Sequence, residues 1–367
     1  MLIKNLEAIP VEIPYTHDGP PTGFGGAIWR TLNYLLIRIE TDDGLVGWGE
    51  AFGYNCIPAT RAAFESMVVP QAIGKDASNI ATLTLELKRA LHLFGRSGPV
   101  QYALGGLDIA LWDLAGKRAG VSISQLFGGP VRDRLQAYSS LMRLSEPATV
   151  RQACERALQK GFKRVKLHEV TVEGVAAARE ATGPEVQLML DVNCAWDLKT
   201  AIAMGRALEP YRLTWLEEPI WPPEDVDALN ALRAAVNIPI AVGENIGNAQ
   251  AFNSLLANDA VLYMQPSVTK VGGISEFAEV AALAKTHKRL LAPHSPYFGP
   301  GLLATLQMGA VFPEIGGVEI FGVELEAPLF GRIGLPDAAG DVAIPIGPGL
   351  GADPDPAVVE KYRVRLA

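Results

Sequence analysis

Three acidic residues follow three successive apolar segments of the chain. Asp191 comes after VQLML, Glu217 after LTWL and Glu244 after IPIAVG. Apolar runs of this length, each followed by a helical pattern, are typical of buried parallel strands with their connecting helices. The acids are 26 and 27 residues apart (191 to 217 and 217 to 244), about one strand, one helix and two loops. We therefore expect three adjacent strands to present three carboxylates at one edge, where they would bind a hard divalent cation such as Mg²⁺. The alternative is that they are strand-end caps or salt-bridge partners of barrel lysines.

Lys166 and His168 lie two residues apart in the segment FKRVKLH, so a strand would point both side chains to the same face. Val165 and Leu167 would then occupy the opposite face. A lysine beside a metal ion has a charge role, and a histidine can exchange a proton near neutral pH. The alternative is that Lys166 only neutralises the carboxylates and that His168 is a core histidine with satisfied hydrogen bonds.

Polar residues at the ends of the apolar segments recur at intervals of 23 to 27 positions: His168, Asp191, Glu217, Glu244, Ser267, His294 and Glu319. In a barrel, His294 would lie across from His168, which allows proton removal on one face of a substrate and proton delivery on the other. Glu319 would either hydrogen-bond a developing oxyanion in its protonated form or pair with a cation.

Other residues are candidates for substrate binding. Lys270 in TKVGG is followed by glycines that let backbone approach a ligand, although a surface lysine fits the pattern equally. Arg30 closes a glycine- and proline-rich stretch, where it would clamp a distal carboxylate or only pack the loop. Asn193 in DVN and Ser267 in MQPS are also expected to face the substrate.

Composition narrows the class of protein. With 367 residues and 49% hydrophobic content, the chain can bury a large core. A formal net charge of −8 and the lack of a Lys/Arg-rich run argue against a nucleic-acid partner. The three cysteines, Cys56, Cys154 and Cys194, fit neither a disulfide framework nor a zinc motif, so free thiols in a reducing cytosol are expected. No apolar run has the length of a membrane span, and we expect a cytoplasmic protein.

The first part of the chain reads as α+β. In residues 1–50, LEAIPVEI alternates, and NYLLIRIE and LVGWGEA flank TDDG, whose Asp-Gly step is a hairpin signal. Residues 15–30 form a long Gly- and Pro-rich loop that we expect to cover something. From residue 58 to residue 120, apolar residues recur at helical spacing.

Residues 135–321 alternate apolar runs with amphipathic helices. Eight strands are predicted, at LQAYSS, FKRVKLH, VQLMLDVN, LTWLEE, IPIAVGE, AVLYMQPS, RLLAPHS and GVEIF. With seven helices between them, they predict a parallel barrel, whose chemistry lies at the carboxyl ends of its strands. The residues after Glu324 are loop-like, without a clear eighth helix, and we expect them to return to the N-terminal domain.

With these residues in place, the chain resembles the enolase superfamily, specifically its mandelate racemase and muconate lactonising branch, over essentially its full length. The motifs GWGE, ALWDLAGK, GFKRVK, DVN, LEEP, GEN, KVGG and APH carry the resemblance. It implies an α/β fold: a modified (β/α)7β TIM barrel at residues 125–324, capped by an α+β domain formed by residues 1–124 and the returning segment 325–367. A homo-oligomer is also implied.

The resemblance further implies roles for single residues. Asp191, Glu217 and Glu244 would bind Mg²⁺. Lys166 would contact the substrate carboxylate, and His168 and His294 would be the acid and base candidates. The capping loops at residues 15–30 and around Tyr54 would set the choice of substrate.

Two positions depart from the family pattern. The usual Lys-x-Lys motif of the second barrel strand is Lys166-Leu167-His168 here, and Ser267 stands where racemase-like members carry an aspartate that pairs with the seventh-strand histidine. That aspartate would fix the tautomer of His294 and favour its cationic form. Ser267 can orient His294 but cannot supply charge, which weighs against two-base racemisation.

The function expected from these features is the strategy known for the superfamily, in which a base removes the α-proton of a carboxylate and Mg²⁺ stabilises the ene-diolate. His294 is the first choice for the acid or base, and His168 the second. Dehydration of a sugar acid to a 2-keto-3-deoxy acid is the leading expectation. The alternatives are a racemase, epimerase or lactone cycloisomerase, and, in a different class, a metal-binding barrel without turnover that serves as a binding protein.

Overall fold

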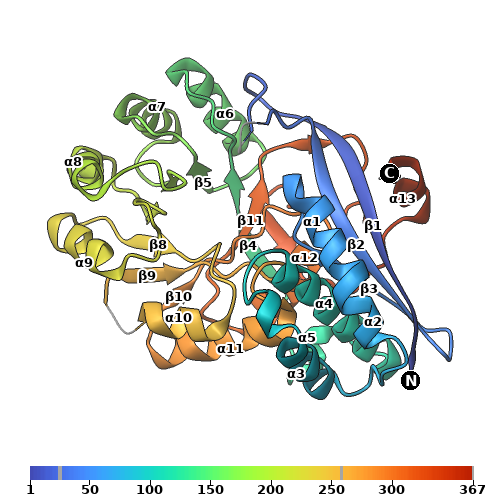
Figure 1. Ribbon diagram of the computed structural model, residues 1–367. Coiled ribbons are helices and arrows are strands. Elements are labelled where there is room, and N and C mark those ends of the chain that lie inside the picture. Colours follow the sequence, from blue (N-terminus) through green and yellow to red (C-terminus); the bar gives the residue numbers. More distant parts are fainter. Residues whose placement is uncertain (24–26, 257–258, 366–367) are drawn as a thin grey trace.

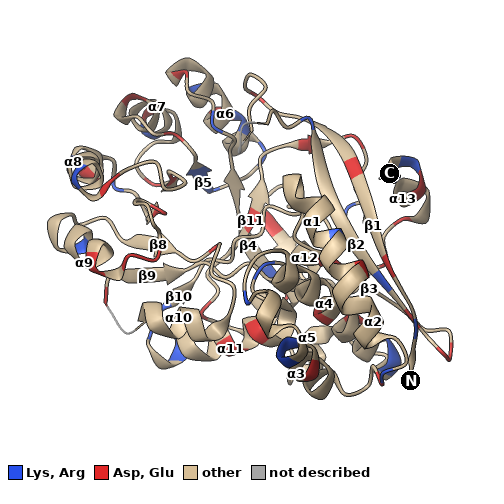
Figure 2. Ribbon diagram, viewed as in Figure 1, with Lys and Arg blue, Asp and Glu red and all other residues tan. Residues whose placement is uncertain are grey.

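The computed structural model describes residues 1–23, 27–256 and 259–365 (Figure 1). Two sheets organise these residues: a four-stranded antiparallel sheet in the order β12-β1-β2-β3, and a curled parallel sheet in the order β10-β9-β8-β7-β6-β5-β4-β11. Lys/Arg and Asp/Glu residues are interspersed along the outer helices α6 to α9 (Figure 2). Within the described ranges, none of the helices combines the length and apolar character that crossing a membrane would require.

The antiparallel sheet forms the cap. Its main strands are β1 (Ile3–Thr16), β2 (Thr31–Thr41) and β3 (Val46–Ala51). The hairpin predicted at TDDG joins β2 to β3, with Gly44 at φ +83°, a left-handed conformation that favours glycine. β1 continues two residues into the predicted loop 15–30, and residues 24–26 of that loop lie outside the described residues.

Helices of the cap cover one face of this sheet. They are α1 (Ile57–Ala63), the π-helical turn Phe64–Val68, α2 (Val69–Ala72), α3 (Ile80–Ala90) and α4 (Pro99–Ala119). The GWGE motif explains how closely α4 packs on β3. A Cβ atom at Gly49 would lie 2.1 Å from the carbonyl oxygen of Gly106, and one at Gly47 would lie 2.6 Å from that of Ala110. Only glycine permits this approach.

The parallel sheet forms the predicted barrel. Its strands are β4 (Arg134–Ser140), β5 (Arg164–Leu167), β6 (Gln187–Asp191), β7 (Leu216–Glu217), β8 (Ile240–Val242), β9 (Val261–Met264), β10 (Leu290–Leu291) and β11 (Val318–Phe321). The barrel closes where Leu291 pairs with Ile315, just before β11. The connecting helices are α6 (Pro147–Gln159), α7 (Val172–Thr182), α8 (Leu198–Leu208), α9 (Val226–Ala235), α10 (Ala249–Leu256), α11 (Gly273–Thr286) and α12 (Pro300–Val311). The predicted (β/α)7β architecture with an α+β cap is confirmed.

Alternation along the strands separates the two faces of the barrel wall. Val165 and Leu167 join the large core between strands and helices, whereas Lys166 turns inward, as predicted. Met189 and Trp215 stand two residues before Asp191 and Glu217 and belong to a small apolar cluster of the barrel interior. This cluster forms the layer beneath the polar residues at the strand ends.

The C-terminal residues contact both the cap and the barrel. β12 (Glu324–Leu325) pairs with β1, β13 (Asp341–Ala343) pairs with β4, and α13 (Pro356–Tyr362) contacts β1. The expectation of a loop-like tail is wrong at α13, where Asp355 caps a short helix that begins with proline. The predicted domain boundaries, after residues 124 and 324, fall within α5 (Ile123–Leu126) and β12 and remain predictions.

Buried carboxylates hold the helices that follow the site-bearing strands. Asp108 of α4 accepts hydrogen bonds from the backbone N–H and the hydroxyl of Ser275 in α11, at 2.9 and 2.6 Å. Glu50 of β3 accepts from the N–H of Gly301 in α12 at 2.8 Å. Each carboxylate satisfies a first-turn donor and meets the positive end of the helix dipole. The cap thereby fixes the helices behind the loops after β9 and β10.

Candidate active site and metal centre

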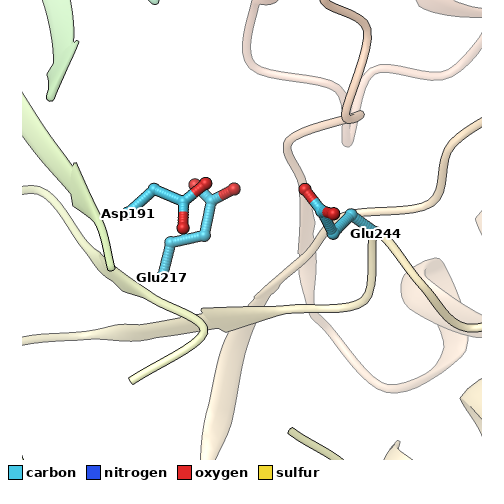
Figure 3. Close-up of side chains that lie close together, drawn as sticks. All are labelled: Asp191, Glu217 and Glu244. Carbon is cyan, nitrogen blue, oxygen red and sulfur yellow. The ribbon is translucent and has the colours of Figure 1, made fainter. Parts of the chain in front are cut away.

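The three predicted metal ligands meet at one end of the barrel. Asp191 and Glu217 end neighbouring strands and pair in register, and Glu244 follows β8. Their side chains point toward a common space (Figure 3), and one ligand atom from each lies within 4.8 Å of the others. Asp191 and Glu217 are buried, whereas the Glu244 side chain is 12% exposed. The three carboxylates could hold one ion, and Asp191 and Glu244 also line the cavity.

Lys166 lies at the base of this group. Its ammonium is 2.9 Å from Glu217 Oε1, 3.3 Å from Asp191 Oδ2 and 2.8 Å from Glu319 Oε1. Burial alone would lower the pKa of Lys166, but the charges of Glu217, Glu319 and Asp191 raise it well above the usual value. This shift favours the charged ammonium. Of the two roles considered for Glu319, pairing with a cation is the one present here.

Glu218 is a site residue that the sequence reasoning missed. Its φ of +42° turns its side chain to the same side as Glu217, although consecutive residues of a strand normally face opposite ways. Its carboxylate accepts from Asn245 Nδ2 at 3.2 Å and from the Cys194 thiol at 3.6 Å. Burial and the charge of Glu244 raise the pKa of Glu218 well above normal. In the sequence, the two consecutive glutamates of LEEP could have indicated that Glu218 also belongs to the site.

The charges of the site fit a bound cation. Five acidic side chains line or underlie the space: Asp191, Glu217, Glu218, Glu244 and Glu319. Two ammonium groups, Lys166 and Lys270, oppose them. Burial and the neighbouring Asp191 raise the pKa of Glu217 well above normal, a sign of excess negative charge in a site removed from water. A divalent ion would neutralise that excess, and the all-oxygen ligand set suits Mg²⁺.

His168 borders the group on the β5 side. Its Nδ1 lies 2.5 Å from the carbonyl oxygen of Leu141, and since a carbonyl only accepts, Nδ1 carries a proton. Its Nε2 lies 3.3 Å from Asp191 Oδ2. Both ring nitrogens thus face acceptors. Arg143 and Glu169 hold the backbone around it, Arg143 by donating to the His168 carbonyl at 2.7 Å.

His294 borders the group on the opposite side. Its Nε2 lies 3.0 Å from Glu244 Oε2, and its Nδ1 lies 3.2 Å from the hydroxyl of Tyr297. Burial lowers the pKa of His294 to about 4, although Glu244 opposes the shift. The imidazole is therefore neutral at neutral pH. Ser267 is fully buried and reaches His294 only through the Tyr297 hydroxyl, which it hydrogen-bonds.

Aromatic side chains of the cap form the far wall of the cavity, which measures about 580 Å³. Trp29 stacks on Tyr54 with ring centroids 4.8 Å apart, and Phe52 meets Tyr54 edge-on at 5.1 Å. Lys270 lies between these rings and the acidic group, 4.4 Å from the Phe52 ring centroid and 3.2 Å from Glu244 Oε1. We call Trp29, Phe52 and Tyr54 the aromatic wall.

The remaining predicted residues have different positions. Asn193 lines the cavity, and its buried Oδ1 has no hydrogen-bond partner within the described part of the chain. Tyr54 and Lys270 also line the cavity. Arg30 is exposed and does not line it, so the structure does not bring this guanidinium to the site.

Comparison with known proteins identifies the family. A model described as enolase C-terminal domain-like matches residues 148–358, and one for the N-terminal domain of mandelate racemase / muconate lactonizing enzyme matches residues 18–128. The chain belongs to the mandelate racemase / muconate lactonizing enzyme branch of the enolase superfamily. The predicted membership is confirmed.

Several members of this family are similar over most of the chain. D-galactarolactone cycloisomerase of Agrobacterium fabrum is 34% identical, covering 90% of this chain and 91% of its own length. D-galactonate dehydratase of Pectobacterium atrosepticum is 34% identical over 74% of each chain. The crystal structure of 3,6-anhydro-D-galactonate cycloisomerase from Zobellia galactanivorans is 29% identical, covers 100% of both chains and superposes with a TM-score of 0.85.

Proposed function

We propose that the protein is a Mg²⁺-dependent lyase that removes the α-proton of a sugar acid and expels the β-hydroxyl, giving a 2-keto-3-deoxy acid. The observation that carries the proposal is the placement of two histidines on opposite sides of the acidic group. His168 Nε2 lies 3.3 Å from Asp191, and His294 Nε2 lies 3.0 Å from Glu244. A substrate seated on this group would have an acid/base residue on each face.

We call the charged side chains at the barrel strand ends, Lys166, Asp191, Glu217 and Glu244, the floor of the site. The floor would supply positive charge for the reaction. Asp191, Glu217 and Glu244 would hold Mg²⁺, which when bound supplies the charge that stabilises an ene-diolate. The Lys166 ammonium, kept protonated by its carboxylate neighbours, would face the substrate carboxylate from below. Because this ammonium is fixed before the substrate arrives, little reorganisation accompanies proton removal.

The two histidines take complementary roles in the proposal. His294, whose pKa burial lowers to about 4, is neutral at neutral pH and accepts the α-proton. His168, with its two nitrogens facing acceptors, donates a proton to the leaving hydroxyl. One proton is taken and one is given, so the pair returns to its starting state by proton exchange with water.

The aromatic wall favours a substrate with a single carboxylate. Among the described residues that line the cavity, the lysines are Lys166 and Lys270, and both pair with floor carboxylates. Rings rather than cations face the distal end of a substrate, and aromatic faces pack well against the C–H edges of a sugar. The name of the D-galactonate dehydratase relative, a monocarboxylic sugar acid enzyme, supports this class.

A cycloisomerase is the second candidate, favoured by the two relatives of that activity that match 90% and 100% of the chain. The first step would be the same. If the β-oxygen belongs to a lactone or anhydro ring, it leaves the β-carbon but stays attached to the molecule, so the product has the mass of the substrate. Dehydration instead removes one water.

The test is a screen of monoacid and diacid sugars, with their lactone and anhydro forms, in the presence of Mg²⁺. Three readouts are combined: 2-keto acid formation by semicarbazone absorbance, deuterium uptake from D₂O at the α-carbon of recovered substrate or at C3 of the product, and product mass. The expected result is keto acid with loss of one water; an unchanged mass favours the cycloisomerase. No deuterium uptake with any acid, while ligands still raise the melting temperature, would contradict both and favour a binding protein.

A further inference from the structure

We propose that Tyr297 positions His294, acting with Ser267 and Thr269 as a buried cluster of three hydroxyls; this inference rests on the proposed function. The Tyr297 hydroxyl lies 3.2 Å from His294 Nδ1 and also hydrogen-bonds Ser267 Oγ. Ser267 Oγ lies 3.3 Å from Thr269 Oγ1. Tyr297 is 4% exposed, and both smaller residues are fully buried. The cluster is therefore shielded from water beside the histidine.

A count of donors and acceptors shows how the cluster can be satisfied. A phenol has one proton to donate and can accept two hydrogen bonds. Tyr297 has side-chain hydrogen bonds with both Ser267 and Thr269, so if Tyr297 donates to His294 Nδ1, these two hydroxyls can donate toward the phenol oxygen. Every polar group of the cluster then has a partner, as buried polar groups require.

Glu244 selects this arrangement when no ion is bound. His294 Nε2 lies 3.0 Å from a carboxylate oxygen of Glu244, which can only accept. Nε2 therefore carries the proton, Nδ1 carries the lone pair, and Tyr297 donates to it. The imidazole ring is held at both ends.

If Glu244 held a metal ion, its oxygens would be less available to His294 Nε2. Tyr297 would then remain as the described side chain that hydrogen-bonds the ring. Tyr297 also packs edge-on against it, with centroids 5.8 Å apart at an interplanar angle of 77°. Tyr297 therefore sets the direction in which Nε2 faces the substrate.

Hydroxyls suit this task because they accept as well as donate. With Glu244 engaged, Nδ1 can carry the proton and donate to the phenol oxygen, while Tyr297 donates to Ser267 or Thr269. Nε2 then presents its lone pair to the substrate. A carboxylate partner could only accept and would favour an imidazolium. The cluster holds His294 in either neutral tautomer without adding charge.

The test compares Tyr297→Phe with Tyr34→Phe. Tyr34 is a matched control because it is equally buried, and its hydroxyl has no hydrogen-bond partner among the described residues. We expect Tyr297→Phe to lower kcat and α-deuterium exchange about 10- to 100-fold, as outer partners of site histidines commonly do. KM and Mg²⁺ affinity should stay near the wild-type values, because an interaction that acts on proton transfer alone changes kcat without changing ground-state binding. Tyr34→Phe should match wild type in all four.

A second readout does not depend on turnover. The ¹⁵N chemical shifts of the His294 ring report which nitrogen carries the proton, with and without Mg²⁺. Wild type should show a hydrogen-bonded Nδ1 in both states, and Tyr297→Phe should lose that signature. Ser267→Ala, which keeps the phenol, should retain the bond and lose less activity than Tyr297→Phe, and it serves if Tyr297→Phe fails to fold.

The outcomes separate this inference from the proposed function. Wild-type kcat in Tyr297→Phe, or a loss confined to KM or Mg²⁺ affinity, overturns the positioning role. Unchanged His294 shifts in Tyr297→Phe do the same, as does wild-type activity in Ser267→Ala if that variant alone folds. If wild type turns over no sugar acid, the proposed function fails, but the ¹⁵N spectra still decide the Tyr297 contact.

Discussion

The two sides of the cavity are built by different means. The floor consists of charged side chains at barrel strand ends, such as Lys166 and Glu217, which are almost fully buried and held by short ion pairs. The aromatic wall consists of cap residues in or beside loops, and its rings are only partly buried. Strand register places the floor, whereas ring contacts place the wall. Barrel enzymes commonly divide chemistry and substrate choice in this way.

The floor and the wall also differ in the free energy that a lost contact costs. A buried charge that loses its partner is costly, because desolvation is no longer offset by attraction. An aromatic pair contributes about 0.5–1.5 kcal/mol beyond the area that it buries. Changes in the floor should therefore abolish activity or unfold the protein, and changes in the wall should mainly alter substrate affinity.

The largest effect is expected at a metal ligand. Glu217→Gln keeps the shape of the side chain but removes one anion from the group, so we expect kcat to fall by about 10³-fold or more. The rise in melting temperature that Mg²⁺ causes should be lost as well. Glu185→Gln, at an exposed position outside the cavity, is the control and should behave as wild type. Full Mg²⁺ stabilisation in Glu217→Gln would remove Glu217 from the metal centre.

Lys166 tests whether the floor depends on charge balance. Lys166→Met leaves Asp191, Glu217 and Glu319 without their shared cation, and breaking such a buried network costs about 3–5 kcal/mol. Denaturant unfolding without Mg²⁺ should show this loss, and added Mg²⁺ should stabilise the variant more than wild type. Exposed Lys199→Met is the control. If the metal-free Lys166→Met variant were as stable as wild type, the stability of the floor would not depend on charge balance.

Glu50 tests the seam between cap and barrel. Burial raises the pKa of this carboxyl from 4.5 to about 7, opposed by the N–H of Gly301. Since the folded pKa exceeds the unfolded one, Glu50 adds stability that is complete below about pH 4.5 and is lost as pH rises through about 7. The full span is about 3 kcal/mol, at 1.36 kcal/mol per pKa unit.

The measurement for Glu50 is urea unfolding of wild type and Glu50→Gln between pH 4.5 and pH 8. The free energy of unfolding of wild type should fall over this window. That of the variant should fall less steeply, because the variant lacks the one proton that Glu50 releases. Glu185→Gln, whose carboxylate is exposed, should keep the wild-type slope. Identical slopes for all three proteins would show that the pKa of Glu50 is the same in the folded and unfolded states.

The floor could be predicted from sequence because its information is local and periodic. Asp191, Glu217 and Glu244 each follow an apolar run, and parallel strands bring such positions together whatever the loops do. The alternation around Lys166 gave its inward direction for the same reason. The barrel follows from the eight runs and seven helices between them.

The wall and several site residues could not be predicted in this way. Glu218 faces the cavity only because its backbone is left-handed, which strand alternation does not foresee. Tyr297 lies in a loop without periodicity, so its contact with His294 depends on tertiary folding. Arg30 has the right chemistry for a distal carboxylate, but Trp29 beside it lines the cavity and Arg30 is exposed.

The smallest expected effect is in the wall. Trp29→Leu removes the ring that stacks on Tyr54, so KM for a monoacid sugar should rise about 3- to 10-fold, the equivalent of an aromatic contact of 0.5–1.5 kcal/mol. Its kcat should stay within about twofold, because no floor contact changes. Leu93→Ala, 80% exposed and outside the cavity, is the control. Trp29→Arg adds a cation and should raise kcat/KM for diacids relative to monoacids. If Trp29→Leu instead lowered kcat more than tenfold at constant KM, the wall would take part in the chemistry, and the division between floor and wall would fail.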